Sequence, residues 1–581
     1  MTSASFLAEL KRRNVHRAAV FYAGAAWLLV QVATQVFPFF DIPNATVRVV
    51  VIAALIGFPF AMAFSWFYEW TPQGIRREAE VDRSASVTRH TGKKLDLAII
   101  GVLGLAVVLL LADRSVLRKP VLEVGDKSVA VLPFANTSGD AGNEYFSDGL
   151  SEELISVLSR LTDLKVIGRT SSFQFKGKTD SSKAIGAALG VSYLLEGSVR
   201  KSADRARIAV ELLKSADGVN VWSQSYDREL KDVFAVQSEI AQEVAAALQV
   251  KLLGGDKLPA TSTTRSVEAH NAYLKGHAYF ERRNDDSFLK AIAFFDEAIS
   301  VDPAYALAYA ERAESHSWFA DQTGKDVAAH RAAARRDADK AVALAPGLAE
   351  AHVALGWVHF FDERDIRDAL SELRTAQKLS PGSAKIQAIL AQVLGSSGQI
   401  DAALATARKA VELDPLYFYA HAMLARSLIG AGKLDEGAAE GRRMAELQPD
   451  ATRSHVNQAI IAALRGDGET ALREARLEPS ESYRRFVLAL AYQARGDHAA
   501  ADAALAELIA RDRDIATFQI ATVYAFRGEN DLAFEWLQRA YDNHDTGILS
   551  ILVDPLLQRV RSDPRYAAML ARLGLELPKT P

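Results

Sequence analysis

The chain starts with long apolar runs, and its apolar positions become periodic only later. Residues 18–40 and residues 49–68 contain no charged side chain, and residues 97–112 form a shorter uncharged run. At about 1.5 Å of rise per residue, each of the first two runs can cross a hydrocarbon core about 30 Å thick as a helix. The pattern predicts a membrane anchor over residues 1–120, with three transmembrane helices at about residues 18–40, 47–69 and 95–113.

Basic residues beside these spans predict the orientation of the anchor. Residues 11–17 and the loop of residues 71–94 are rich in Arg and Lys, whereas the loop of residues 41–46 has neither. The positive-inside rule places the two basic segments in the cytoplasm. Three crossings then place the rest of the chain outside, so we expect a multi-pass protein of a bacterial inner membrane with periplasmic soluble domains. If the third run does not span, the soluble part lies in the cytoplasm instead.

From residue 127 to residue 253 the apolar runs are shorter and alternate with helical patterns. Strand-like runs, rich in β-branched residues, cover residues 128–134, 164–168, 191–200, 206–214 and 219–226. Helical patterns begin at Ser151, Ser182 and Val233. The resulting order, β-α-β-α-β-β-β-α, predicts a small α/β domain with a mixed sheet.

Three stretches of this domain resemble a known module. They read KSVAVLPFANTSGDAGNEYFSDGLSEELISVLSRLTDLKVIGRTSSFQFKGK, IGAALGVSYLLEGSVRK and DVFAVQSEIAQEVAAALQ. They are similar to the TolB amino-terminal/FlgO-like module, and residues 7–80 look like the membrane lead-in that often precedes it. The resemblance implies a bacterial envelope protein in which the module is joined to tetratricopeptide repeats. In related chains the module follows a cyclase or a winged-helix DNA-binding domain, and residues 1–126 contain neither.

After a linker at residues 254–267, the sequence repeats with a period close to 34 residues. Prolines recur at positions 346, 381, 415 and 449, and small residues such as Ala403, Ala407 and Ala410 precede them at fixed spacings. This period and these small residues at helix contacts are typical of tetratricopeptide repeats. We expect an all-α solenoid of about eight units over residues 268–545, closed by a capping segment at residues 546–581.

The register of the repeats also predicts a binding groove. First helices line the concave side of such a solenoid, and aromatic and charged side chains there could bind a protein or peptide. Each of these side chains could equally pack between repeats. The candidate groove residues are Tyr273, His277, Phe280, Trp318, Trp357, Phe360, Tyr419 and Arg426.

Composition argues against several other functions. Of the 581 residues, 49% are hydrophobic and none is Cys, which excludes disulfides, thiol chemistry and Cys-ligated metals. The net charge of −4 argues against a nucleic-acid binder that relies on a basic surface. Gly177-Lys178-Thr179 lacks the spacing of a phosphate-binding loop, and the 12 His residues show no metal-binding spacing. We therefore expect no enzyme activity, cofactor, metal or nucleic-acid partner.

Two functions fit this organisation. The first is a membrane-anchored scaffold whose α/β domain and repeats bind protein or peptide partners outside the cytoplasm. The alternative is a transmembrane sensor that signals through its helices to a separate cytoplasmic effector, such as a cyclase or a transcription regulator. The repeat array and the absence of an effector domain favour the scaffold, and the resemblance to sensor-like chains favours the alternative.

Overall fold

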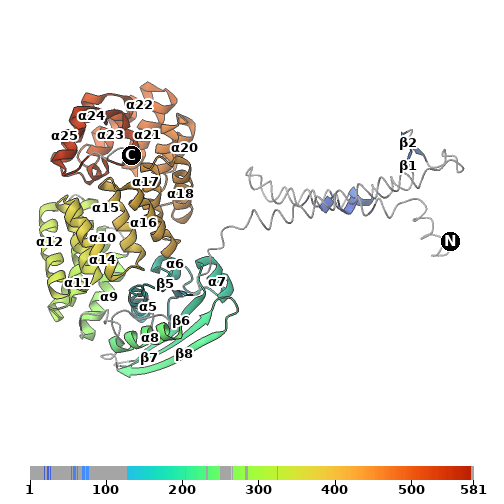
Figure 1. Cartoon of the computed structure of the whole chain (residues 1–581), viewed down its shortest axis with the longest axis vertical. Coiled ribbons are helices and arrows are strands. Elements are labelled where there is room, and N and C mark those ends of the chain that lie inside the picture. Colours follow the sequence, from blue (N-terminus) through green and yellow to red (C-terminus); the bar gives the residue numbers. More distant parts are fainter. Residues whose placement is uncertain are drawn as a thin grey trace. The chain divides into compact units, whose positions relative to one another are not determined.

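The computed structural model describes residues 127–576, apart from gaps at 203–204, 230–232, 249–263, 265, 282–284 and 324, together with scattered residues between 19 and 77. The chain divides into two compact units, Met1–Val121 and Leu122–Pro581 (Figure 1).

Most residues of the first two predicted membrane spans, and all residues of the third, lie outside the described residues of the first unit. In the part of this unit that is described, strands β1 (Tyr68–Thr71) and β2 (Gly74–Arg77) form an antiparallel pair. No helix among the described residues combines the length and the apolar character that a bilayer crossing requires.

The second unit begins with the predicted mixed sheet, in which the strand order is β5-β3-β6-β7-β8. Strand β3 runs parallel to β5 and β6, whereas β6, β7 and β8 pair in antiparallel fashion, so that β8 forms one edge (Figure 1). The strands are β3 (Ser128–Val131), β4 (Ala135–Asn136, paired with β6), β5 (Lys165–Val166), β6 (Tyr193–Ser202), β7 (Arg205–Lys214) and β8 (Asn220–Glu229).

Helices cover the two faces of this sheet unequally. Alternate residues of β7, from Ala206 to Leu212, are buried in one hydrophobic cluster with α5 (Glu144–Leu158) and α8 (Val233–Ala247). A smaller cluster on β3 and β6 packs against α7 (Ser182–Leu189). A short helix, α6 (Arg169–Phe173), follows β5. The sequence pattern did not reveal β4 or α6, and it placed the start of α5 seven residues too late, at Ser151 instead of Glu144.

Helix pairs follow, and they confirm the prediction of a tetratricopeptide-repeat solenoid. Within the described residues from 267 to 542 there are eight pairs of helices. In the third pair, the first helix continues as a π-helical turn, η5 (Val358–Asp362). The pairs are α9 (Val267–Phe280) with α10 (Asp285–Val301), α11 (Ala306–Thr323) with α12 (Val327–Leu344), α13 (Ala349–Trp357) with α14 (Ile366–Leu379), α15 (Ala384–Ser396) with α16 (Ile400–Leu413), α17 (Phe418–Gly430) with α18 (Leu434–Leu447), α19 (Val456–Leu464) with α20 (Gly468–Leu477), α21 (Glu481–Arg495) with α22 (His498–Asp512), and α23 (Thr517–Arg527) with α24 (Asn530–Asp542).

Small residues allow the paired helices to approach closely. Ala403, Ala407 and Ala410 on α16 are completely buried. A Cβ atom added to Gly356 would lie 2.9 Å from Cγ of Leu373 on the partner helix, which is closer than such atoms approach. The close packing of protein interiors leaves no room for larger side chains at these positions.

Candidate functional site

The predicted groove residues lie on first helices, as the repeat register requires. Tyr273, His277 and Phe280 are on α9, Trp318 is on α11, Trp357 ends α13, Phe360 is in η5, and Tyr419 and Arg426 are on α17.

Most of these side chains are buried or partly buried in the structure and do not line an open surface. Phe280 and Phe360 are completely buried, and Tyr273 and Trp357 are only 5% and 4% exposed. Trp318 and Tyr419 are partly buried in the same cores. The rings of Trp357 and Trp318 lie 5.4 Å apart, and that of Trp357 lies 4.5 Å from the ring of Phe361. These aromatic side chains therefore pack inside the molecule and do not form an exposed strip.

The C-terminal segment covers the later part of the concave side. It consists of η6 (Thr546–Ser550), η7 (Pro555–Val560) and α25 (Pro564–Arg572). Ile548 and Ile551 of this segment are fully buried in one hydrophobic cluster that includes Trp357 and Ile389 of the first helices. The expected capping segment does contact the last helix pair, since η7 packs on α23 and α25 on α24, and its η6 also reaches the first helix α15.

Two polar contacts hold the start of this C-terminal segment, both of them in η6. Thr546 donates a hydrogen bond from Oγ1 to Oδ1 of Asp321 at 3.1 Å, near the end of α11. Arg426 donates from Nη2 to Oγ of Ser550 at 2.9 Å. Burial lowers the pKa of Arg426 to about 10, and the charge of Arg453 contributes to the shift. Arg426, predicted as a partner contact, is thus a partly buried side chain that makes an internal contact.

The α/β domain covers the earlier part of the concave side. Nε2 of His277 on α9 lies 2.5 Å from Oε2 of Glu152 on α5, and its Nδ1 lies 2.7 Å from Oε2 of Glu311 on α11. Arg169 of α6 binds Glu152 from the other side, with Nε 2.5 Å from Oε1. His277 is therefore a bridge between the domain and two repeats.

These contacts form the joint between the α/β domain and the repeats, and they shift the pKa values of several buried groups. The two flanking carboxylates raise the pKa of His277 well above its usual value, although burial alone would lower it. Burial raises the pKa of the neighbouring Glu153 to about 8, and the charge of Glu152 adds to the effect. Burial also lowers the pKa of His270 to about 3. At neutral pH the joint thus favours a protonated His277 and a protonated Glu153 beside a neutral His270.

Further contacts extend the joint along the turns between repeats. Ser156 on α5 donates to Oε1 of Glu350 at 3.2 Å, and the backbone N–H of Gly382 donates to the carbonyl of Ser159 at 2.9 Å. Asp414, directly before Pro415, accepts a hydrogen bond from the backbone N–H of Ser171 at 2.8 Å and another from its hydroxyl. The domain therefore contacts repeats from the first to the fourth.

A close backbone approach accompanies the Asp414 contact. The N–H of Gly168 donates to the carbonyl of Leu413 at 2.8 Å. A Cβ atom on Gly168 would clash with the Asp414 side chain, so only glycine fits at this position. Nothing in the local sequence indicates this contact, because its partners are more than 240 residues apart.

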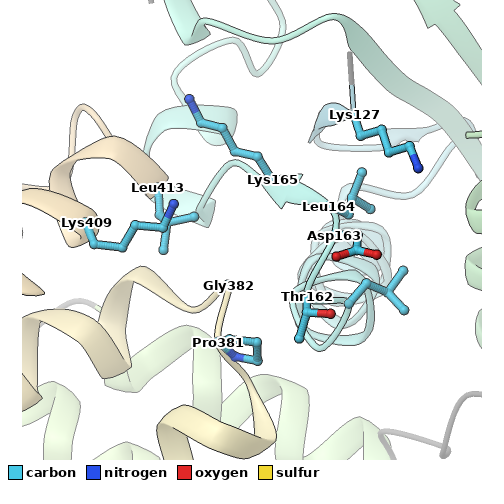
Figure 2. A pocket seen from close by; sticks show the side chains of 10 residues that line it. Lys127, Thr162, Asp163, Leu164, Lys165, Pro381, Gly382, Lys409 and Leu413 are labelled. Carbon is cyan, nitrogen blue, oxygen red and sulfur yellow. The ribbon is translucent and has the colours of Figure 1, made fainter. Parts of the chain in front are cut away.

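A cleft of about 520 Å³ opens between the domain and the fourth repeat (Figure 2). Lys127, Lys165 and Lys409 line it together with Asp163. Burial lowers the pKa of Lys165, while Glu412 opposes and Lys409 reinforces that shift. The ammonium groups of Lys127 and Lys165 point in different directions in Figure 2, so the cleft has a basic wall without a single point of convergence.

The histidines of the repeats have a structural role that the sequence analysis did not assign. His352 bonds the carbonyl of Pro346 through Nε2 at 2.9 Å and Glu372 on the second helix through Nδ1 at 2.6 Å. His421 makes the same two contacts, to Pro415 and Glu440. The shared signal is a polar residue six positions after each repeat proline, at 352, 387, 421 and 455. In the part of the chain that is described, no cluster of His, Asp and Glu is arranged to hold a metal ion.

Family comparisons identify the repeats and give a different description of the α/β domain. Residues 359–418, 390–452 and 486–548 match a model of the tetratricopeptide repeat. Residues 125–243 match a model described as "HilA/YgeH-like transcriptional regulator, second domain". The expected resemblance to the TolB amino-terminal/FlgO-like module is not supported by this match.

One curated relative is a putative adenylate cyclase 3 from Rhizobium meliloti (strain 1021), 39% identical over 184 residues. The aligned part comprises 32% of this chain and 31% of that protein, so the chain spans about a third of its length.

Among solved structures, the chain is similar to YrrB, described as a tetratricopeptide-repeat protein with an unusual peptide-binding site, at 22% identity and a TM-score of 0.25 over 36% of this chain and 96% of that one. It is also similar to PilW, a type IV pilus biogenesis factor, at 17% identity and a TM-score of 0.29 over 36% of this chain and 90% of that one.

Proposed function

We propose that the chain is a protein-interaction scaffold held at a bacterial inner membrane by its N-terminal anchor, with its soluble domains in the periplasm and no catalytic step of its own. The observation that carries the proposal is the solenoid of eight helix pairs, because tetratricopeptide repeats generally bind protein or peptide partners. The docked α/β domain and C-terminal segment occupy its concave side, so partners contact the remaining surfaces.

Site-specific photo-crosslinking in cells tests the scaffold. The exposed positions Leu289 on α10 and Leu477 on α20 each receive a photoreactive side chain, and the buried Leu373 serves as the matched control. We expect specific protein adducts from the exposed positions only. The proposal fails if the exposed positions give no more adducts than Leu373, and adducts confined to cytoplasmic signalling proteins favour the sensor.

The sensor is a second candidate, favoured by two findings. The α/β domain of the chain matches a model named for a transcriptional regulator, and a curated relative of the chain is named as a putative adenylate cyclase. The basic cleft, lined by Lys165 of the α/β domain and Lys409 of the fourth repeat, would be a place for an anionic signal. If Lys409→Glu leaves the response of every candidate effector unchanged in cells, this cleft has no such role.

The membrane topology is tested separately. Reporter fusions at about residue 85 and about residue 260 should report cytoplasm and periplasm respectively, because the loop of residues 71–94 is basic. A cytoplasmic signal at the second position would contradict the third span and the periplasmic location together. The crosslinking experiment would still test the scaffold function after that result.

A further inference from the structure

Strands β6, β7 and β8 have one face in the core and one outer face. From Ala206 to Leu212, alternate residues of β7 lie in the core with α5 and α8, and Figure 1 shows both helices on one side of the sheet. The other residues of β7 point to the outer face, where Arg205, Arg207 and Glu211 are exposed and Ala209 is half-buried. Helix α7 packs on the start of β6 on that face. Within the described residues, the helices leave the rest of the outer face open to solvent.

Like charges lie directly opposite each other on this outer face. Arg200 of β6 is the cross-strand partner of Arg207 of β7, and these two residues form the arginine row. Glu196 of β6 is the partner of Glu211 of β7, and these two form the glutamate row. Burial raises the pKa of Glu196, and the charge of Glu211 raises it further. Like charges directly opposite each other destabilise a sheet.

The charges of the two rows are not neutralised within the chain. In the part of the chain that the structure describes, none of the four side chains forms an ion pair, since Asp227, opposite Arg207 on β8, binds Arg205 instead. Glu211 accepts one hydrogen bond from the neutral amide of Asn220 at 3.3 Å. The two rows are four residues apart along each strand, which is about 13 Å at about 3.4 Å per residue. Each row therefore keeps two charges of one sign.

A row of small side chains separates the two charged rows. Ser198, Ala209 and Ser225 form it on β6, β7 and β8, as cross-strand partners of one another. Small side chains at the centre allow a second sheet to approach to the usual distance of about 10 Å between packed sheets. An Arg side chain and a Glu side chain can together span that gap.

The charge pattern of the outer face is complementary to itself. A two-fold axis that runs across the strands, along the row of small side chains, reverses the strand direction of a second copy. Arg207 of each copy then faces Glu211 of the other. Arg200 faces Glu196 in the same way. An axis along the strands would place like charges on each other, which is costly, so the charges select the first orientation.

We propose that two copies of the chain associate face to face through the outer face of β6, β7 and β8, with the arginine row of each copy on the glutamate row of the other. Two sheets with nearly aligned strands commonly pack in this way, and two-fold pairs are the commonest assemblies of identical chains. The association is independent of the proposed scaffold function, because it uses the α/β domain and no surface of the solenoid.

Charge reversal tests the proposal on the full-length protein in detergent. Arg207 and Glu211 are exposed, so their substitution should leave the fold intact. Arg207→Glu places Glu on Glu between identical copies, and Glu211→Arg places Arg on Arg. Light scattering should give a protein mass of two chains for the wild type and a dissociation constant at least about tenfold weaker for each variant. Arg511→Glu, at an exposed position of α22, is the matched control and should leave the dissociation constant unchanged.

An equimolar mixture of the two variants gives the sharper test. A copy with Arg207→Glu and a copy with Glu211→Arg again oppose acidic to basic side chains at every charged position of the interface. The mixture should therefore recover the mass of two chains, with a dissociation constant close to that of the wild type. Recovery would also show that both variants are folded.

Three outcomes would overturn the proposal. The first is a wild type with the mass of one chain at every concentration, which would leave the outer face to a partner of another sequence. The second is a two-chain mass that Arg207→Glu and Glu211→Arg weaken no more than Arg511→Glu does, which would place the contact elsewhere. The third is a mixture of the two variants that associates no better than either variant alone, which would exclude the proposed orientation.

Discussion

The early repeats of the solenoid hold the α/β domain through ionic and polar contacts beside a shared apolar core, whereas the later repeats hold the C-terminal segment mainly through apolar side chains. His277, Glu152 and Asp414 represent the ionic and polar contacts, and the buried Ile548 and Ile551 represent the apolar ones. Apolar burial depends little on pH, but an ionic joint depends on the protonation of each member. The two contacts should therefore respond differently to mutation and to pH.

The largest effect is expected where the C-terminal segment covers the solenoid. Trp357→Ala should lower the free energy of unfolding by about 3–5 kcal/mol, because it leaves a cavity in a core in which the residue is 4% exposed. Urea unfolding of the compact unit Leu122–Pro581 measures this effect. The matched control, Leu477→Ala at a position 54% exposed, should cost about 0.5 kcal/mol or less. Equal costs for the two variants would mean that Trp357 lies in an open groove.

A smaller loss is expected at the joint with the α/β domain. Asp414→Ala removes the acceptor for the Ser171 N–H and hydroxyl, and it should cost about 1–3 kcal/mol of stability through unsatisfied buried donors. Asp450→Ala, at an exposed turn position of the following repeat, is the control. If both variants unfold at the same urea concentration, the domain is not held by Asp414.

The change that separates the two contacts most cleanly depends on pH. Folding raises the pKa of Glu153 to about 8 from 4.5, so its contribution to stability is fully present below pH 4.5 and is lost as the pH rises toward 8. Glu153→Gln cannot ionise, so its stability relative to the wild type should increase between pH 5 and pH 8. Glu507→Gln, at an exposed position of α22, should show no such trend. A flat difference for Glu153→Gln would contradict the buried, protonated carboxyl.

The repeats were predictable because their signals are local. Prolines spaced by about 34 residues and buried alanines such as Ala403 report contacts within one unit or between neighbours. The alternation of β7 likewise reports a sheet with one buried face. The repeat register also placed the predicted groove residues on first helices, because equivalent positions recur in every repeat of a solenoid.

The filling of the groove was not predictable in the same way. Trp357 packs on Trp318 and Phe361, and the same core includes a segment that returns almost 200 residues later, which no local pattern records. The contact between Ser171 and Asp414 is of the same kind, because an Asp before a Pro has the sequence of an ordinary turn. The joint was also missed because Glu152 and Glu153 fit equally well as solvated residues of a helix.

Hydrogen–deuterium exchange of the full-length chain in detergent, at pH 7, tests the central claim that the concave side is filled by the chain's own elements. The amides of residues 548–557 should exchange as slowly as those of α15, because the segment and that helix share one core. The amides of α6 should exchange faster than these, since the polar joint opens without global unfolding. Exchange of residues 548–557 at the rate of exposed loops would contradict the account and leave the groove open to a partner.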